Sequence, residues 1–314
     1  MQRVITAALA ACAILFAYTA ADAQQRRGPG FFPNLPVVNQ NGETLKFYDD
    51  LIKDKIVVIM FIYTSCTDIC PLTTARMTLV EDRLGDKLGK DIFIVSMTVD
   101  PEVDTPEKLK AYSKAFATGP GWTFVTGKPD DIRAINHRLG ERSKVLSDHR
   151  NEIVLGNDAT GEWQRDNLMG DLDRVVTTIR EMDPNYREQA RAVPRNAAMN
   201  TGLAMGTQPG QAMYKKICAP CHTIGVGDKV GPDLRGVTER RERGWLVSYL
   251  RNPSAMLAKN DPVARELAAR FAPVTMPNMR LSEQDADDLI SFLHQENAKL
   301  VEAPAPARPH EHKH

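Results

Sequence analysis

An apolar run without alternation, at residues 56–63, is the feature that most limits how this chain can fold. Such a run is typical of a strand covered on both faces, as in a parallel sheet flanked by helices. It leads into Cys66 and Cys70, and Pro71 fits the first turn of a helix, where a missing N–H costs nothing. We expect both thiols on one side of that turn, near the positive end of the helix dipole. They could form a disulfide or hold one metal ion.

Length, charge and cysteine count narrow the class of protein. A chain of 314 residues suggests about two domains. Lys+Arg and Asp+Glu both total 40, so no electrostatic case arises for binding nucleic acid or an acidic membrane surface. The five cysteines are Cys12, the pair Cys66 and Cys70, and the pair Cys218 and Cys221. The two pairs leave no cysteine for a structural disulfide elsewhere.

The first 23 residues have the charged, apolar and Ala-x-Ala regions of a secretory signal peptide, and we expect cleavage after Ala23. An uncleaved anchor is the alternative, because the apolar run 4–20 is only slightly shorter than the ~20 residues of a spanning helix. Lipid attachment at Cys12 is less favoured, since the apolar core before it is short. Each interpretation exports the protein. We therefore expect a periplasmic location, with membrane attachment only through an uncleaved leader.

Residues 24–185 are predicted to form a first domain in which strands and helices alternate. A strand, a helix and a second strand imply a right-handed crossover and parallel pairing. Thr105 and Pro106 supply a cap and a first-turn proline for a later helix. Together with a late hairpin, this order predicts a thioredoxin-like α/β fold. The expected elements are strands 56–63, 92–99 and 122–126, helices 71–86, 106–116 and 172–179, and a hairpin over 152–164.

Four segments of this domain resemble the signature segments of the Sco/SenC family: 61–71, 99–106, 121–124 and 148–149. The resemblance covers nearly the whole domain. It implies a thioredoxin-like fold and a copper ion bound by Cys66, Cys70 and His149. It also implies a role in assembling the dinuclear copper site of cytochrome c oxidase.

The chemistry of the donors favours copper independently. Soft thiolates select Cu(I), and an imidazole adds a ligand that also suits Cu(II). In a second interpretation Cys66 and Cys70 are a redox-active pair that cycles between dithiol and disulfide and reduces another protein. In the plainest one they form an inert structural disulfide.

Other polar residues near these segments have competing roles. His149 is either a ligand or a solvated loop histidine. His137, on a helical pattern, is the competing ligand, although a surface position is more usual for it. Asp100 and Asp104 either tune the site or act in turns and caps, and we favour turns and caps.

Residues 186–209 show no sustained apolar period and are predicted to be a flexible tether to a second domain at 210–298. That domain opens with Cys218, Cys221 and the adjacent His222, which is the attachment motif for c-type haem. The two thiols add covalently to the haem, and the histidine ligates the iron. A zinc or disulfide site is the alternative.

The rest of the second domain resembles the small monohaem cytochrome c family over its entire length. The resemblance implies that His222 and Met276 are the axial ligands and that the Pro232 carbonyl accepts the other N–H of His222. Met279 is the rival sixth ligand, less favoured because it does not precede a proline. Residues 282–285 are a capping box at the start of an amphipathic final helix.

The last residues, 299–314, are proline- and alanine-rich and predicted to be disordered. Their His310, His312 and His314 either collect Cu(II) weakly or have no role. The whole chain is predicted to be an exported copper chaperone for a respiratory copper enzyme such as cytochrome c oxidase. One covalent haem c would transfer electrons to or from its copper or thiol centre. The alternatives are a thiol–disulfide oxidoreductase powered by its own cytochrome and a plain electron-transfer protein, and a classical enzyme is less favoured.

Overall fold

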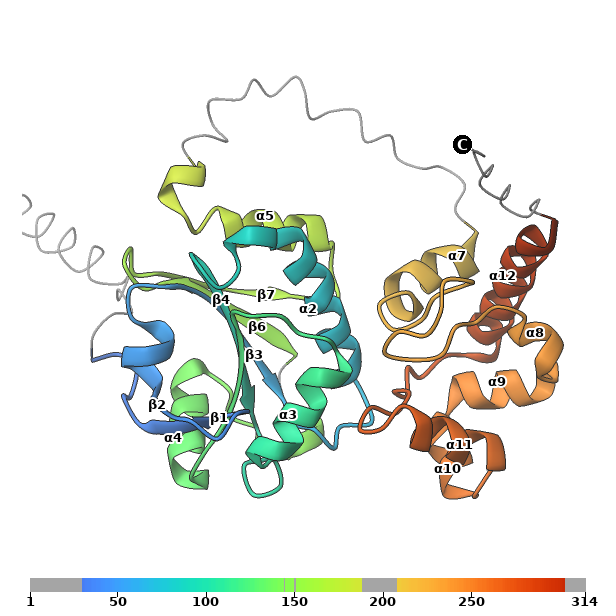
Figure 1. The fold of residues 1–314 in the computed structure, drawn as a ribbon, viewed down its shortest axis with the longest axis horizontal. Coiled ribbons are helices and arrows are strands. Elements are labelled where there is room, and N and C mark those ends of the chain that lie inside the picture. Colours follow the sequence, from blue (N-terminus) through green and yellow to red (C-terminus); the bar gives the residue numbers. More distant parts are fainter. Residues whose placement is uncertain (1–29, 144, 150, 188–207, 303–314) are drawn as a thin grey trace, which may run out of the picture.

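The computed structural model describes residues 30–143, 145–149, 151–187 and 208–302, which form two domains side by side (Figure 1). The predicted leader, most of the predicted tether and residues 303–314, with His310, His312 and His314, lie outside the described residues. Residues 299–302, the start of the tail predicted to be disordered, continue the final helix instead. Among the helices of the described residues, none is long and apolar enough to cross a membrane.

A seven-stranded mixed sheet forms the centre of the first domain. Its strands are β1 Pro36–Asn39, β2 Thr44–Lys46, β3 Ile56–Ile62, β4 Ile92–Thr98, β5 Trp122–Thr126, β6 Glu152–Asn157 and β7 Glu162–Asn167. They are arranged in the order β2-β1-β5-β4-β3-β6-β7. The three central strands β5, β4 and β3 run parallel, and the flanking strands pair antiparallel. The parallel pairing of β3 with β4 and the β6–β7 hairpin confirm the sequence predictions.

Helices cover both faces of this sheet. One face is covered by α2 Cys70–Leu84, α3 Pro106–Ala115 and α5 Leu172–Arg180. The other is covered by α4 Pro129–Leu139 and a short helical turn, η1 Phe47–Ile52. This sandwich of helix, sheet and helix is the α/β thioredoxin-like fold that the sequence predicted.

Strand β3 lies in the middle of the sandwich, and all seven of its residues are buried. Alternate side chains enter the two apolar clusters on opposite faces of the sheet, Val58, Met60 and Ile62 on one side and Val57, Ile59 and Phe61 on the other. Because both faces are covered, neither set needs to be polar. This is the physical reason for the apolar run without alternation.

The helix after β3 begins too late for both cysteines to lie in its first turn, as the sequence analysis expected. α2 begins at Cys70, with Pro71 in its first turn as expected. Cys66 lies in the loop before it, so the expectation that both cysteines share the first helical turn was wrong. Thr105 caps α3 as predicted, since its side chain accepts a hydrogen bond from the Lys108 amide.

The second domain is helical, as predicted. Its elements are α7 Pro209–Met213, η5 Tyr214–Cys218, α8 Val237–Arg240, α9 Arg243–Arg251, α10 Pro253–Ala258, α11 Pro262–Arg270 and α12 Glu283–Glu302. Gly210 lets α7 cross α12 at backbone contact, because a Cβ there would lie 2.1 Å from the Asp288 carbonyl oxygen. Ser282 and Asp285 exchange hydrogen bonds at the start of α12, which confirms the capping box.

Candidate metal centre and adjoining cavity

The two cysteines of the first domain lie at the carboxyl end of β3, in and just after the segment that we call the thiol loop (residues 63–69). The Asp104 carboxylate anchors this loop: it accepts hydrogen bonds from the Thr64 amide at 3.1 Å and from the Thr64 hydroxyl at 2.5 Å. Thr98, the last residue of β4, donates to the same carboxylate at 2.6 Å. Asp104 is 1% exposed, so a buried carboxylate joins the loop to the neighbouring strand. It is a loop anchor and not the turn-and-cap residue that we favoured from sequence.

Cys66, Cys70 and His149 come together into one buried cluster. Their ligand atoms all lie within 4.8 Å of one another, and Cys70 Sγ lies 3.2 Å from His149 Nε2. The side chains are 4%, 0% and 6% exposed, respectively. Both thiols are free. Two thiolates and an imidazole at these separations can hold one soft metal ion.

His149 reaches the cysteines because of the sheet topology. It lies just before β6, which pairs antiparallel with β3. The beginning of β6 and the carboxyl end of β3 therefore meet at the same edge of the sheet. His137, the competing ligand, is exposed on α4, on the opposite face of the sheet from α2. The structure thus brings His149, and not His137, to the thiols.

Tyr63 contacts both His149 and Cys66, and the sequence reasoning missed it. Its ring meets the His149 ring edge-on, with centroids 5.4 Å apart, and its hydroxyl hydrogen-bonds to Cys66. His149 Nδ1 is buried and has no hydrogen-bond partner among the described residues. Metal-bound histidines usually have their second nitrogen held by such a partner. Here the ring contact of His149 is the edge-on packing of Tyr63.

The two thiols differ in acidity. Hydrogen bonds from Cys70, His149 and Tyr63 outweigh the effect of burial and lower the pKa of Cys66. Burial and the adjacent Cys66 sulfur raise the pKa of Cys70 well above its ordinary value. At neutral pH the pair therefore carries one stabilised thiolate and one thiol that keeps its proton.

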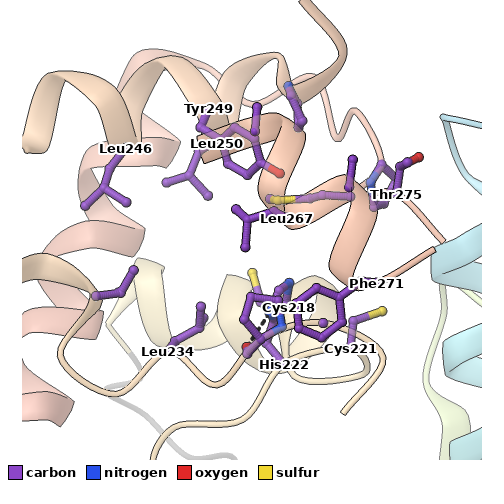
Figure 2. Close-up of a pocket in the computed structure, with 18 of the residues that line it drawn as sticks. Cys218, Cys221, His222, Leu234, Leu246, Tyr249, Leu250, Leu267, Phe271 and Thr275 are labelled. Carbon is purple, nitrogen blue, oxygen red and sulfur yellow. Dashed lines mark hydrogen bonds between the residues drawn. The ribbon is translucent and has the colours of Figure 1, made fainter. Parts of the chain in front are cut away.

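A cavity of about 720 Å³ lies in the second domain. Figure 2 shows Cys218, Cys221 and His222 on one side of it, with Leu246, Leu250 and Leu267 across from them. Most of its lining is apolar, and both thiols line it. A large flat macrocycle with two thiol-reactive substituents matches this shape and chemistry, so the residues present fit a c-type haem.

His222 is prepared to bind iron through its free nitrogen. Its Nδ1 lies 2.9 Å from the Pro232 carbonyl oxygen, as predicted, so Nδ1 carries the proton and Nε2 keeps its lone pair. Burial lowers the pKa of His222 and keeps the ring neutral. Gly231 packs against the ring, where a Cβ would lie 2.6 Å from its Cε1 atom. Met276 is among the residues that line the cavity and Met279 is not, which favours Met276 as the second iron ligand.

The thiol loop also reaches this cavity. Thr67 and Pro71 of the first domain are among its lining residues. Thr67 lies between the two cysteines, and Pro71 directly follows Cys70. Part of the cavity wall is therefore built from the segment that carries the candidate metal ligands.

Fold and sites together define a class of protein: a thioredoxin-like domain with a thiolate–imidazole site, joined to a haem-binding helical domain. The SCO1/SenC family model matches residues 24–190, more than half of the chain, and the Cytochrome c model matches residues 207–297. The chain belongs to the SCO1/SenC family and carries a cytochrome c domain in addition.

Individual relatives match the first domain only in part. An SCO2-like protein of Rickettsia felis is 37% identical over 103 residues, 33% of this chain and 48% of that protein. A protein of Stutzerimonas stutzeri that bears the provisional name of copper-binding protein is 30% identical over 108 residues, 34% of this chain and 51% of that protein. The chain thus spans about half the length of these curated relatives. The copper-bound structure of ScoI from Bradyrhizobium japonicum is 24% identical and has a TM-score of 0.40, covering 48% of this chain and 99% of that one.

Proposed function

We propose that this chain is an exported, periplasmic copper chaperone that loads a respiratory copper site, such as the dinuclear centre of cytochrome c oxidase. The observation that carries the proposal is the buried set of Cys66, Cys70 and His149, with donor atoms within 4.8 Å of one another. Thiolates hold Cu(I), and the imidazole also suits Cu(II), so one site accepts both oxidation states. Copper is the cargo of this site, and family membership supports the assignment.

The second part of the proposal concerns the cytochrome domain. The proposed haem c is attached through Cys218 and Cys221 and ligated by His222 and Met276, and when bound it supplies one-electron chemistry. Thr67 and Pro71 line the same cavity, so copper held by the neighbouring cysteines lies close to it. Cu(II) takes up one electron on becoming Cu(I), whereas a disulfide takes up two. A single haem therefore matches the needs of copper better than those of a disulfide.

An anaerobic titration tests both parts together. The haem-loaded, reduced protein is titrated with Cu(II) while the haem spectrum and the bound copper are followed, in wild type and in Cys66→Ser. We expect one equivalent of copper to bind with stoichiometric haem oxidation in wild type, and neither in the variant. Tight binding with an unchanged haem spectrum would reject the electron-transfer part and leave the chaperone part. The absence of tight binding would reject both.

A thiol–disulfide oxidoreductase is the second candidate, and one observation favours it. The pKa of Cys66 is lowered while that of Cys70 is raised, as in pairs where one thiolate attacks and the other thiol resolves. This candidate predicts reduction of a protein disulfide that is lost in Cys66→Ser. A plain electron-transfer protein instead predicts that both cysteines can be replaced without effect.

A further inference from the structure

The two domains touch at the segments that carry their proposed metal ligands. The amide of Asn278 donates a hydrogen bond to the Thr67 carbonyl at 3.0 Å. Arg280 Nη2 lies 3.1 Å from Asp68 Oδ2. Thr67 and Asp68 are residues of the thiol loop, and Asn278 and Arg280 belong to the segment that we call the docking loop (residues 276–280), which starts at Met276.

A second set of contacts extends this interface along α2. The guanidinium of Arg76 is held by the Leu168 and Gly170 carbonyls of its own domain and donates to the Lys216 carbonyl of the cytochrome domain at 2.5 Å. Arg76 is 5% exposed. Apolar contact accompanies these hydrogen bonds, because Cys221 and Val274 belong to the same buried cluster as the inner face of α2.

The outer part of this interface is weakly held, unlike the contact made by the buried Arg76. Its ion pair is solvated, with Arg280 and Asp68 side chains 79% and 42% exposed, and exposed pairs contribute little to stability. Interfaces between domains of one chain generally resemble transient protein–protein contacts, so relative motion of the domains is expected.

We propose that the cytochrome domain acts as a cap on the thiol loop, and that an acceptor protein receives copper only after this interface opens. This inference rests on the proposed copper-chaperone function. Transfer between proteins requires an acceptor ligand to reach the copper, yet all three candidate ligands are at most 6% exposed when the domains are docked. Thr67 and Asp68, between the two cysteines, and Pro71, just after them, face the cytochrome domain. An acceptor that approaches from this side must displace it.

Competition between the cytochrome domain and an acceptor protein for the thiol loop slows the transfer of copper. If only the opened form transfers copper, the apparent transfer rate equals the rate of the opened form multiplied by the fraction of molecules that are open. Any change that weakens docking therefore accelerates copper release without altering the ligands.

Charge reversal provides the test, on the full haem-loaded chain with Cu(I) bound. In Asp68→Arg or Arg280→Asp, like charges replace the ion pair, and the double variant restores it with the charges exchanged. We expect each single variant to release copper to a bulky uncharged Cu(I) chelator about three- to fivefold faster than wild type. The double variant should return to within about twofold of wild type. Arg133→Asp is the matched control, because it breaks the ion pair with Glu102, which is not among these interface contacts.

Hydrogen–deuterium exchange gives a readout that does not depend on copper. The Asn278 amide is bonded to Thr67, so its exchange should accelerate in both single variants and recover in the double variant. Unchanged exchange in the single variants, or faster exchange with unchanged copper release, would overturn the cap. If the wild type binds no copper, the proposed function fails on its own. The rate of alkylation of Cys66 in the copper-free protein then tests whether the cytochrome domain covers the thiol loop. Faster alkylation in the single variants than in wild type supports the cap, and equal rates reject it.

Discussion

The molecule contains two cysteine pairs that are built in opposite ways. Cys66 and Cys70 obtain their histidine from a residue 79 positions beyond Cys70, and their cluster exists only because the sheet brings β3 and β6 together. Cys218 and Cys221 have His222 beside them in the sequence, and they line an open cavity of about 720 Å³. The first site is formed by tertiary structure, and the second by a local motif on the wall of a cavity.

The acidities of the two pairs differ accordingly. Donors around Cys66 lower its pKa, whereas burial raises the pKa of Cys218 and of Cys221 to about 12. A stabilised thiolate suits reversible metal binding. Cys70 shares its raised pKa with Cys218 and Cys221, so the difference between the two pairs lies in the single thiolate at Cys66. The surroundings of a thiol pair, more than its spacing, therefore distinguish a site suited to an exchangeable ion from a site suited to a permanently attached group.

The largest effect is expected at the haem-attachment motif. We expect Cys218→Ser combined with Cys221→Ser to abolish covalent haem attachment, because no thiol would remain among the residues that line the cavity. Copper affinity should stay within about threefold of wild type, since the sites share no ligands. Haem staining of denatured protein and a copper competition titration measure the two properties. A large loss of copper affinity would show that the copper site needs the filled cavity.

The reciprocal change removes a copper ligand. Cys66→Ser should lower Cu(I) affinity by at least about 100-fold, because even loss of a partner outside the ligand set typically costs about 10- to 100-fold. Haem content should be unchanged. Competition with a Cu(I) chelator measures the affinity, and His137→Ala is the control that should behave as wild type. Equal losses in both variants would contradict the ligand set proposed here.

The third prediction concerns which of two methionines is the second iron ligand. Met276→Ala should lower the haem potential, on the order of 100 mV, because loss of the thioether removes the ligand that raises it. Met279→Ala should leave the potential unchanged, since Met279 does not line the cavity. Potentiometric titration of both variants decides, and a shift in Met279→Ala alone would exchange the two roles.

A smaller effect is expected at the anchor of the thiol loop. Asp104→Asn keeps the shape of the side chain but replaces one acceptor oxygen with a donor that faces the Thr64 and Thr98 donors. We expect about a 10-fold loss of copper affinity, with the haem spectrum unchanged. Asp100→Asn is the matched control, because no bond joins its side chain to Thr64. If both variants lose affinity equally, the effect is one of charge and not of anchoring.

Much of this architecture was predictable, for reasons that lie in particular residues. Three features depend on only a few neighbouring residues, and the structure has them where the sequence indicated. They are the buried apolar run of β3, the helix cap at Thr105 and the capping box at Ser282. β1 and β2 were not predicted, because strands of four and three residues carry too short a pattern. The strand order β2-β1-β5-β4-β3-β6-β7 depends on contacts between distant segments and could not be read from periodicity.

The site residues divide in the same way, into those that belong to a local motif and those that depend on contacts between distant segments. His222 was evident because it belongs to a contiguous motif, while His149 came only from a family resemblance. Asp104 and Tyr63 were misjudged or missed, because their roles depend on which strand ends meet at one edge of the sheet. A buried aspartate directly after a strand and a tyrosine directly before the thiols were the available signals.

The smallest predicted effect concerns protons and tests the acidity difference directly. Copper displaces every proton still present on its thiolate ligands. At pH 7 the lowered pKa of Cys66 leaves that thiol already ionised, while the raised pKa of Cys70 keeps its proton. Binding of one Cu(I) should therefore release about one proton at pH 7, and affinity should rise about tenfold per pH unit there. As the pH falls through the pKa of Cys66, release should climb from one proton towards two.

Tyr63→Phe moves this balance in a known direction. It removes one of the hydrogen bonds that lower the pKa of Cys66, but not the leading one from Cys70, so the pKa rises only part of the way to its ordinary value. The climb from one released proton towards two then begins at a higher pH than in wild type. Titration of weakly buffered protein with a pH indicator counts the protons. Release of two protons by the wild type at pH 7 would mean that Cys66 is an ordinary thiol, and the contrast between the two cysteine pairs would then rest on geometry alone.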